Sequence, residues 1–109
     1  MVENIEITDE EFGPILKYIR DDTYVNINYT NNTLYLRDKE NNLYKINDSE
    51  AINSWAKKFF NMICEKTNRH IDFYDPYIYV WANNDNLKIT CTSVPMTNLD
   101  CVITIRKFN

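Results

Sequence analysis

The chain has 109 residues, of which 44% are hydrophobic and 26% charged, and its formal net charge at pH 7 is −4. This length supports one domain with a single core, and the 14% aromatic content excludes a disordered chain. The negative charge and the largely scattered lysines and arginines argue against direct nucleic-acid binding, which needs clustered cations. No apolar segment reaches the length of a membrane span, and Met1–Asn4 does not resemble a signal peptide. We therefore expect a cytoplasmic protein without membrane insertion.

The cysteines give no sign of a disulfide or metal framework. Cys64, Cys91 and Cys101 are an odd number without CxxC spacing, which is typical of cytosolic thiols packed as small apolar groups. A zinc site would need more ligands at closer spacing, and His70 is the sole histidine. We expect no metal.

An N-terminal helix is predicted between Ile5 and Arg20. Thr8 followed by Glu11 has the pattern of a capping box, but Pro14 would then lie too deep inside the helix. Gly13 as the cap, with Pro14 at the first helical position, is the better fit. This helix is expected to be scaffold without chemistry.

Three short strands are predicted next, at Tyr24–Tyr29, Leu34–Arg37 and Leu43–Ile46, because apolar and polar residues alternate along them. The chain contains one glycine, so another residue must supply the left-handed backbone of its turns. Asparagine tolerates that conformation. It is doubled between strand-like segments at positions 31–32, 41–42 and 83–84.

The main helix is expected from about residue 48 to 66, beginning at Asp48 and Ser49, with Asn68 as its left-handed cap. Its aromatic stripe follows three- and four-residue spacings, which is far more typical of packing on a sheet than of a ligand site. The stripe consists of Ile52, Trp55, Ala56, Phe59, Phe60 and Ile63.

Three further strands are predicted at Tyr77–Ala82, Leu87–Val94 and Cys101–Lys107. The first carries bulky residues on both faces, so it is either central or covered by a partner. The predicted fold class is α+β: an antiparallel sheet of about six strands, packed against one long amphipathic helix (about 48–66) and a shorter N-terminal helix.

Catalytic signatures are weak. Neither Ser49 nor Ser93 has the context of a nucleophile elbow, and His70 as a base for Cys64 lacks any oxyanion-hole pattern. Asp72 and Asp75 flank a turn, where capping is a commoner role than acid–base catalysis. No GxxxxGK[ST] or GxGxxG segment is present. We expect a non-catalytic domain that binds no cofactor by itself.

Several segments resemble a known family. Asn68–Asp72, Pro76, the following hairpin, Val94–Pro95 and above all Thr104–Phe108 are similar to the N-terminal domain of the hexameric secretion and conjugation traffic ATPases. These enzymes serve type II and type IV secretion, pilus assembly and conjugation. The resemblance covers nearly the whole chain from about Ile15.

Some positions depart from the family pattern. Asn68 stands where the family has glycine, His70 where it has a second arginine, and Val94 where it has the first of two prolines. Lys88 takes the place of an arginine, and a lysine lacks the bidentate geometry of a guanidinium.

In that family the domain forms one tier of a ring above a RecA-like domain with Walker motifs, and nucleotide binds between the two. The resemblance implies that Arg106, Lys88 and Arg69 reach nucleotide phosphates or a neighbouring subunit. It also implies ATP with Mg in the parent enzyme, and as partners the RecA-like domain, a homohexamer and secretion-machinery membrane proteins at the inner face of the membrane. The chain is then either an excised domain or a stand-alone homologue. The alternative is that Arg106 and Lys107 only solvate the strand end and that Lys88 lies on an open face.

Two other functions stay open. A small acidic interaction or inhibitor protein from a mobile element would use Tyr77–Trp81 as its binding face. A thiol or cysteine enzyme is the third and weakest possibility.

Overall fold

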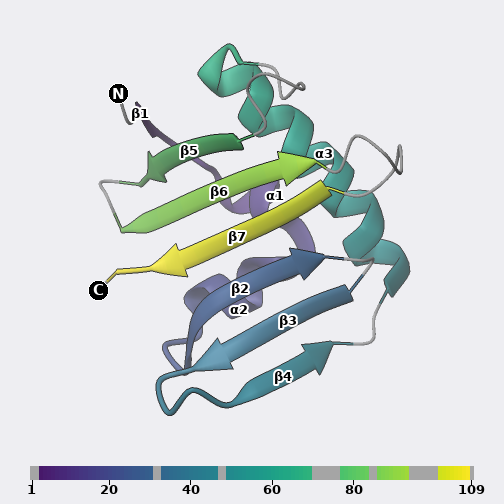
Figure 1. Ribbon diagram of the computed structural model, residues 1–109, viewed down its shortest axis with the longest axis vertical. Helices are drawn as coiled ribbons and strands as arrows, with labels where there is room; N and C mark the ends of the chain where they lie inside the picture. The colour runs from purple at the N-terminus through teal and green to yellow at the C-terminus, as the bar shows by residue number, and fades with distance from the viewer. Residues whose placement is uncertain are drawn as a thin grey trace.

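A computed structural model describes residues 3–30, 33–46, 49–69, 77–83, 86–93 and 101–108. They form a mixed α+β fold in which helices cover one face of a seven-stranded sheet (Figure 1). The α+β class is as predicted. In chain order the elements are β1 (Glu3–Ile5), α1 (Asp9–Phe12), η1 (Gly13–Ile15), α2 (Leu16–Arg20), β2 (Tyr24–Thr30), β3 (Thr33–Asp38), β4 (Leu43–Ile46), α3 (Ser49–Thr67), β5 (Tyr77–Ala82), β6 (Leu87–Ser93) and β7 (Cys101–Lys107).

The sheet is built from two antiparallel meanders, β2–β3–β4 and β5–β6–β7. The strand order β1-β5-β6-β7-β2-β3-β4 joins them through an antiparallel pairing of β7 with β2. As a result, the last strand in the sequence lies in the middle of the sheet (Figure 1).

Strand β1 corrects the prediction of about six antiparallel strands. It is a seventh strand and pairs parallel to β5, with Asn4 opposite Trp81. Its three residues are too few to show alternation. Asn83 extends this pairing, because its backbone N–H donates to Ile5 O at 2.9 Å and its side-chain Oδ1 accepts the N–H of Ile7 at 2.8 Å. The Asn83 side chain thus continues the hydrogen bonding beyond the end of β1.

The predicted N-terminal helix is broken into three short pieces. Thr8 and Glu11 do form a capping box, which begins α1, so the choice of Gly13 over that box as the helix start was wrong. Gly13, at φ 52°, ends α1, and Pro14 lies in η1. The capping box therefore begins the first helical piece, and Gly13 and Pro14 begin the next one. A Cβ at position 13 would lie 3.1 Å from Trp55 Cδ1, so the site also favours glycine sterically.

Asparagine replaces glycine in the turns, as predicted. Positive φ angles occur at Asn41 (71°), Asn68 (54°) and Asn83 (52°). Asn68 is the predicted residue just past α3. The predicted turn at positions 31–32 lies outside the described residues.

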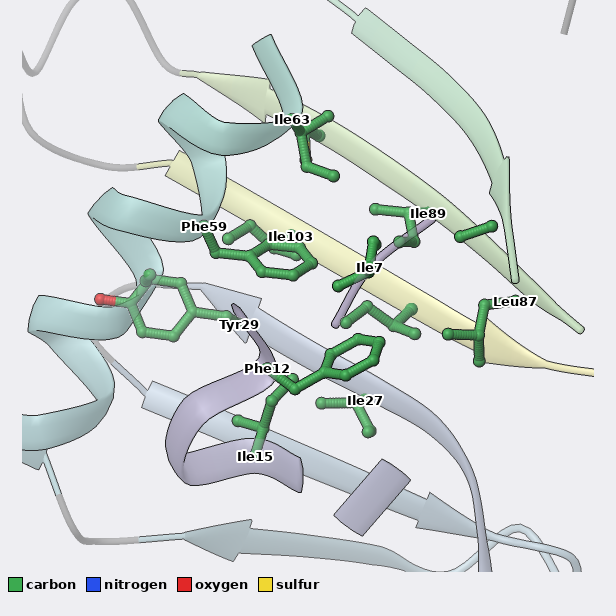
Figure 2. Close-up of a cluster of buried hydrophobic side chains, with 14 of the residues drawn as sticks. Ile7, Phe12, Ile15, Ile27, Tyr29, Phe59, Ile63, Leu87, Ile89 and Ile103 are labelled. Carbon is green, nitrogen blue, oxygen red and sulfur yellow. The ribbon is translucent and has the colours of Figure 1, made fainter. Parts of the chain in front are cut away.

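The core lies between the sheet and α3 (Figure 2). The predicted stripe of α3 is buried, with Phe60 only partly so. The ring of Phe59 lies 4.9 Å from that of Trp55 and 6.2 Å from that of Phe12, between centroids. Cys91 is fully buried in this core, as expected for a small apolar side chain. Helix α3 contacts β3 of the first meander and β7 of the second, so it spans both meanders.

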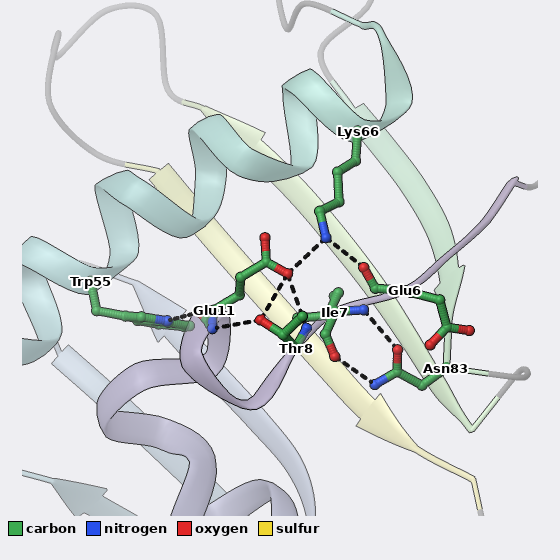
Figure 3. A network of polar contacts seen from close by, with 7 residues as sticks. All are labelled: Glu6, Ile7, Thr8, Glu11, Trp55, Lys66 and Asn83. Atoms are coloured by element: carbon green, nitrogen blue, oxygen red, sulfur yellow. Dashed lines mark hydrogen bonds and ion pairs between the residues drawn. The ribbon is translucent and has the colours of Figure 1, made fainter.

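A polar network ties the N-terminal segment to the end of α3 (Figure 3). Lys66 Nζ donates to Glu11 Oε1 at 2.7 Å and to the backbone oxygen of Glu6 at 2.5 Å. Trp55 Nε1 donates to Glu11 O at 3.1 Å. The bond from Lys66, followed by the backbone N–H of Thr8, lowers the pKa of Glu11. These contacts hold α1 against α3 and thereby keep the helical layer on one side of the sheet.

The β3–β4 turn is organised by the carboxylate of Asp38. Oδ1 accepts backbone N–H groups of Glu40 and Asn42 at 3.0 and 2.8 Å, and Oδ2 accepts Asn42 Nδ2 and the Tyr44 hydroxyl. Burial alone would raise the pKa of Asp38, but these hydrogen bonds outweigh it, so the pKa is lowered from 3.8. The hydrogen bonds of the turn therefore stabilise the ionised form of Asp38.

Asp38→Ala is expected to lower the melting temperature by several degrees, because four donors of this turn lose their acceptor. Since the folded pKa lies below the unfolded one, the carboxylate's contribution is complete above about pH 4 and disappears as the pH falls through the folded pKa. Melting curves from pH 7 to pH 2 measure this. The variant should lose less stability on acidification than the parent, and an equal loss in both would contradict the assignment.

Candidate functional site

The face of the sheet that the helices leave uncovered carries two of the three predicted cations, Lys88 and Arg106. Its side chains alternate along each strand with the buried ones, so they point away from α3, and in Figure 1 the helices lie behind the sheet. We call this the open face; it comprises Asn26, Asn28, Thr30, Thr33, Tyr35, Arg37, Leu43, Lys45, Tyr77, Tyr79, Trp81, Lys88, Thr90, Thr92, Val102, Thr104 and Arg106.

Lys88 and Arg106 are brought together by the register of two neighbouring strands. They lie directly opposite each other on β6 and β7. The row continues to Trp81 on one side and through Asn26 to Arg37 on the other. Like charges directly opposite each other destabilise a sheet unless an opposite charge lies near. The described residues of the open face include no carboxylate. This row therefore attracts an anion.

The two cations rest on aromatic rings. Lys88 Nζ lies 6.0 Å from the centroids of both Tyr79 and Trp81, and Arg106 Cζ lies 5.2 Å from that of Phe108. Both cations are exposed and neither has an ion-pair partner among the described residues. Ring contacts hold the charges without neutralising them. They stay available to an anionic ligand.

Lys107 has a different environment from its neighbour Arg106. Its side chain lies on the helical side, where Nζ donates to the backbone oxygens of Tyr18 and Asp21, both at 2.6 Å. These carbonyls end α2, so the lysine caps the negative end of that helix. Burial lowers the pKa of Lys107. For Lys107 the alternative of merely solvating the strand end is wrong, because Lys107 joins β7 to α2. Arg106 and Lys88 are exposed on the open face, as that alternative expects.

Arg69 does not join the other two predicted cations. It follows the end of α3, where its backbone N–H donates to Cys64 O at 3.0 Å, and it lines a shallow hollow with Glu65 and Asn68. Since α3 covers the helical face, Arg69 belongs to the opposite layer from Lys88 and Arg106. One site therefore contains two of the three predicted residues.

Other predicted chemistry finds little support in the described residues. Burial raises the pKa of the Cys64 thiol, which opposes the thiolate that a nucleophile requires. His70, Asp72 and Asp75 lie outside the described residues. Within the described ranges no group of three His, Cys, Asp or Glu side chains is placed to hold a metal ion. In the same ranges no helix combines the length and apolarity needed to cross a membrane.

Sequence reasoning missed two cations of the open face. Arg37 lies in the same row as Arg106, and its Nη1 donates to Asn41 Oδ1 at 2.8 Å; Lys45 lies in the next row, opposite Tyr35. If the predicted strands are paired as hairpins across the turns at 31–32 and 39–42, Arg37 and Lys45 fall on the same face of the sheet. Their alignment with Arg106 additionally needs the β2–β7 pairing, for which the sequence has no local signal.

Comparison with known proteins gives a likeness in fold. No protein-family model matches the sequence. No curated protein matches it either. Among solved structures, the VirB11 ATPase from the Brucella suis type IV secretion system, in complex with sulphate, is similar with a TM-score of 0.75 and 10% sequence identity. The match covers 93% of this chain and 30% of that chain. This chain thus has the fold of a part of a secretion ATPase and spans about a third of its length.

Proposed function

We propose that this chain acts as the non-catalytic N-terminal domain of a hexameric secretion or conjugation ATPase, contributing ring contacts and one face of the nucleotide cleft. The observation that carries this proposal is the juxtaposition of Lys88 and Arg106 on an open face without carboxylates. Two adjacent cations suit the charge of a nucleotide's phosphates. The fold likeness to the VirB11 ATPase supports the same function.

In this proposal the chain supplies charge and a separate motor domain supplies the phosphate-binding loop. No such loop motif occurs in these 109 residues. Arg106 bonds the phosphates with its planar guanidinium, and Lys88 adds a point charge beside it. Lys107 keeps β7 in place and takes no part in binding, because its Nζ is already bonded to two carbonyls.

The test is to measure ATP turnover by this domain together with its motor domain. A GxxxxGK[ST] segment, in the reading frame beyond Asn109 or in a neighbouring gene, would identify that motor domain. Arg106→Ala should lower kcat by about 100- to 1,000-fold, because a charge-stabilising donor is lost. Lys45→Ala is the matched control, since it removes an exposed cation from β4 on the same face. Unchanged turnover in Arg106→Ala would overturn the site.

A second function, a stand-alone interaction or inhibitor protein, is favoured by the exposed side chains of Tyr77 (49%), Tyr79 (46%) and Leu43 (54%). Cross-linking from position 79 in the native host distinguishes the two. Capture of a secretion ATPase supports the first function, and capture of an unrelated protein supports the second.

A further inference from the structure

The aromatic side chains of β5 form a ladder on the open face, beside its cations. Tyr77, Tyr79 and Trp81 occupy alternate positions of β5 and therefore project from the same face, at intervals of about 6.6 to 6.8 Å along the strand. The rings of Tyr77 and Tyr79 lie 6.0 Å apart between centroids. Phe108 adds a fourth ring, 5.2 Å from that of Trp81. One nucleotide has a single base, so this ladder exceeds what one nucleotide would cover.

The face is cationic although the protein is acidic. Four cations, Arg37, Lys45, Lys88 and Arg106, belong to the open face. The described carboxylates belong to the N-terminal segment, the turns and α3. These four cations are scattered in the sequence, which is why the sequence alone predicts no nucleic-acid contact. The sheet collects them because neighbouring strands come from distant segments.

Between the rings and the outer cations lie short polar side chains. Thr90, Thr104 and Asn28 occupy consecutive strands in the row that runs from Tyr79 to Lys45. Hydroxyl and amide groups donate to and accept from base edges and sugar hydroxyls. A surface of stacking rings, adjacent cations and small polar groups on a sheet is the physical combination that binds single strands.

We propose that the open face binds single-stranded nucleic acid, with bases stacked on Tyr77, Tyr79 and Trp81 and phosphates placed along Lys88 and Arg106. Charge complementarity selects a polyanion, and the ring ladder selects unpaired bases over a carboxylate-rich peptide. The net charge of −4 opposes binding at a distance, but that repulsion is screened beyond about 8 Å at physiological salt. Binding is consequently weak and strongly salt-dependent.

Fluorescence anisotropy with a labelled 15-nucleotide oligo(U) or oligo(dT) tests this binding on the chain itself. The expected Kd lies roughly between 1 and 100 μM at physiological salt. Tyr79→Ala should weaken binding about tenfold, since it removes one stacking ring from an exposed position. Lys88→Gln should reduce the slope of log K against log salt by about 0.7. Lys57→Gln, an exposed cation of α3, is the control and should change neither quantity.

Three results would overturn the proposal. One is no anisotropy change up to about 1 mM protein, well above the non-specific range. Another is equal affinity for a duplex or an oligoglutamate of matched charge, since the surface would then recognise charge and not unpaired bases. The third is unchanged binding in Tyr79→Ala. Circular dichroism of each variant confirms that it is folded.

A separate readout distinguishes this inference from the proposed ATPase function. Titration with the oligonucleotide should quench tryptophan fluorescence in the parent, and this quenching should be lost in Trp81→Phe because the other tryptophan, Trp55, is buried. Retained quenching would contradict stacking at β5. Tyr77 belongs to the ladder, but the cation–ring contacts of Lys88 and Arg106 among the described residues involve Tyr79, Trp81 and Phe108. Tyr77→Ala should therefore weaken oligonucleotide binding and leave ATP turnover unchanged, which separates the two functions whichever of them fails.

Discussion

Phe59→Ala is expected to lower the free energy of unfolding by about 4 kcal/mol, the cost of deleting a fully buried ring and leaving a cavity. Phe59 is 1% exposed and packs against Trp55 of its own helix. It also packs against Phe12 of α1 (Figure 2), so its loss weakens the contact between α3 and α1. Urea denaturation followed by circular dichroism measures the change. A domain of this size has a total stability of about 5 to 15 kcal/mol, so this single change is a large fraction of it.

Phe60→Ala is the matched control, because Phe60 is the next residue of the same helix and is only partly buried. Its cost should be at most half that of Phe59→Ala. Equal costs for the two variants would mean that α3 does not present Phe59 to the sheet as described.

Lys107→Met is expected to lower the free energy of unfolding by about 2 kcal/mol, because the carbonyls of Tyr18 and Asp21 lose a charged donor. Methionine keeps the apolar stem of the lysine, so the difference reports the ammonium group. Arg106→Met on the same strand should change stability by no more than about 0.5 kcal/mol, since its side chain is exposed.

The pair Lys107→Met and Arg106→Met distinguishes a structural from a binding cation in adjacent residues. Urea midpoints at pH 7 give both values in one series. A larger loss from Arg106→Met than from Lys107→Met would reverse the assignment of the two residues.

Most of the strands follow from local pattern. The predicted bounds of β4, β5 and β7 agree with the structure, because alternation is clear in β7 and turn residues flank β4 and β5. Strand β1 was missed because its three residues have no period, and it forms only when β5 offers an edge. The helix expected from Ile5 to Arg20 failed at Gly13, where the packing of Trp55 fixes a break that sequence periodicity does not reveal.

The residues of the candidate site could be predicted from the sequence in part, but their arrangement could not. Lys88 and Arg106 were predicted as site residues from the family resemblance. That they lie directly opposite each other depends on the register of β6 against β7. That register is a tertiary property, since a shift of one residue would place one of the two cations on the helical face. Arg69 was grouped with them by resemblance alone, and the structure places it beyond α3, on the other layer.

The position of β7 between β6 and β2 has a consequence for synthesis on the ribosome. The β2–β3–β4 meander and the β5–β6 pair emerge first, each with an unpaired strand edge, and nothing joins them into one sheet until β7 is made. The chain is made at about 5 to 20 residues per second, so several seconds pass between the synthesis of β2 and that of its second neighbour, β7. During that wait the nascent protein depends on chaperones or on its own acidic charge to avoid pairing with other chains.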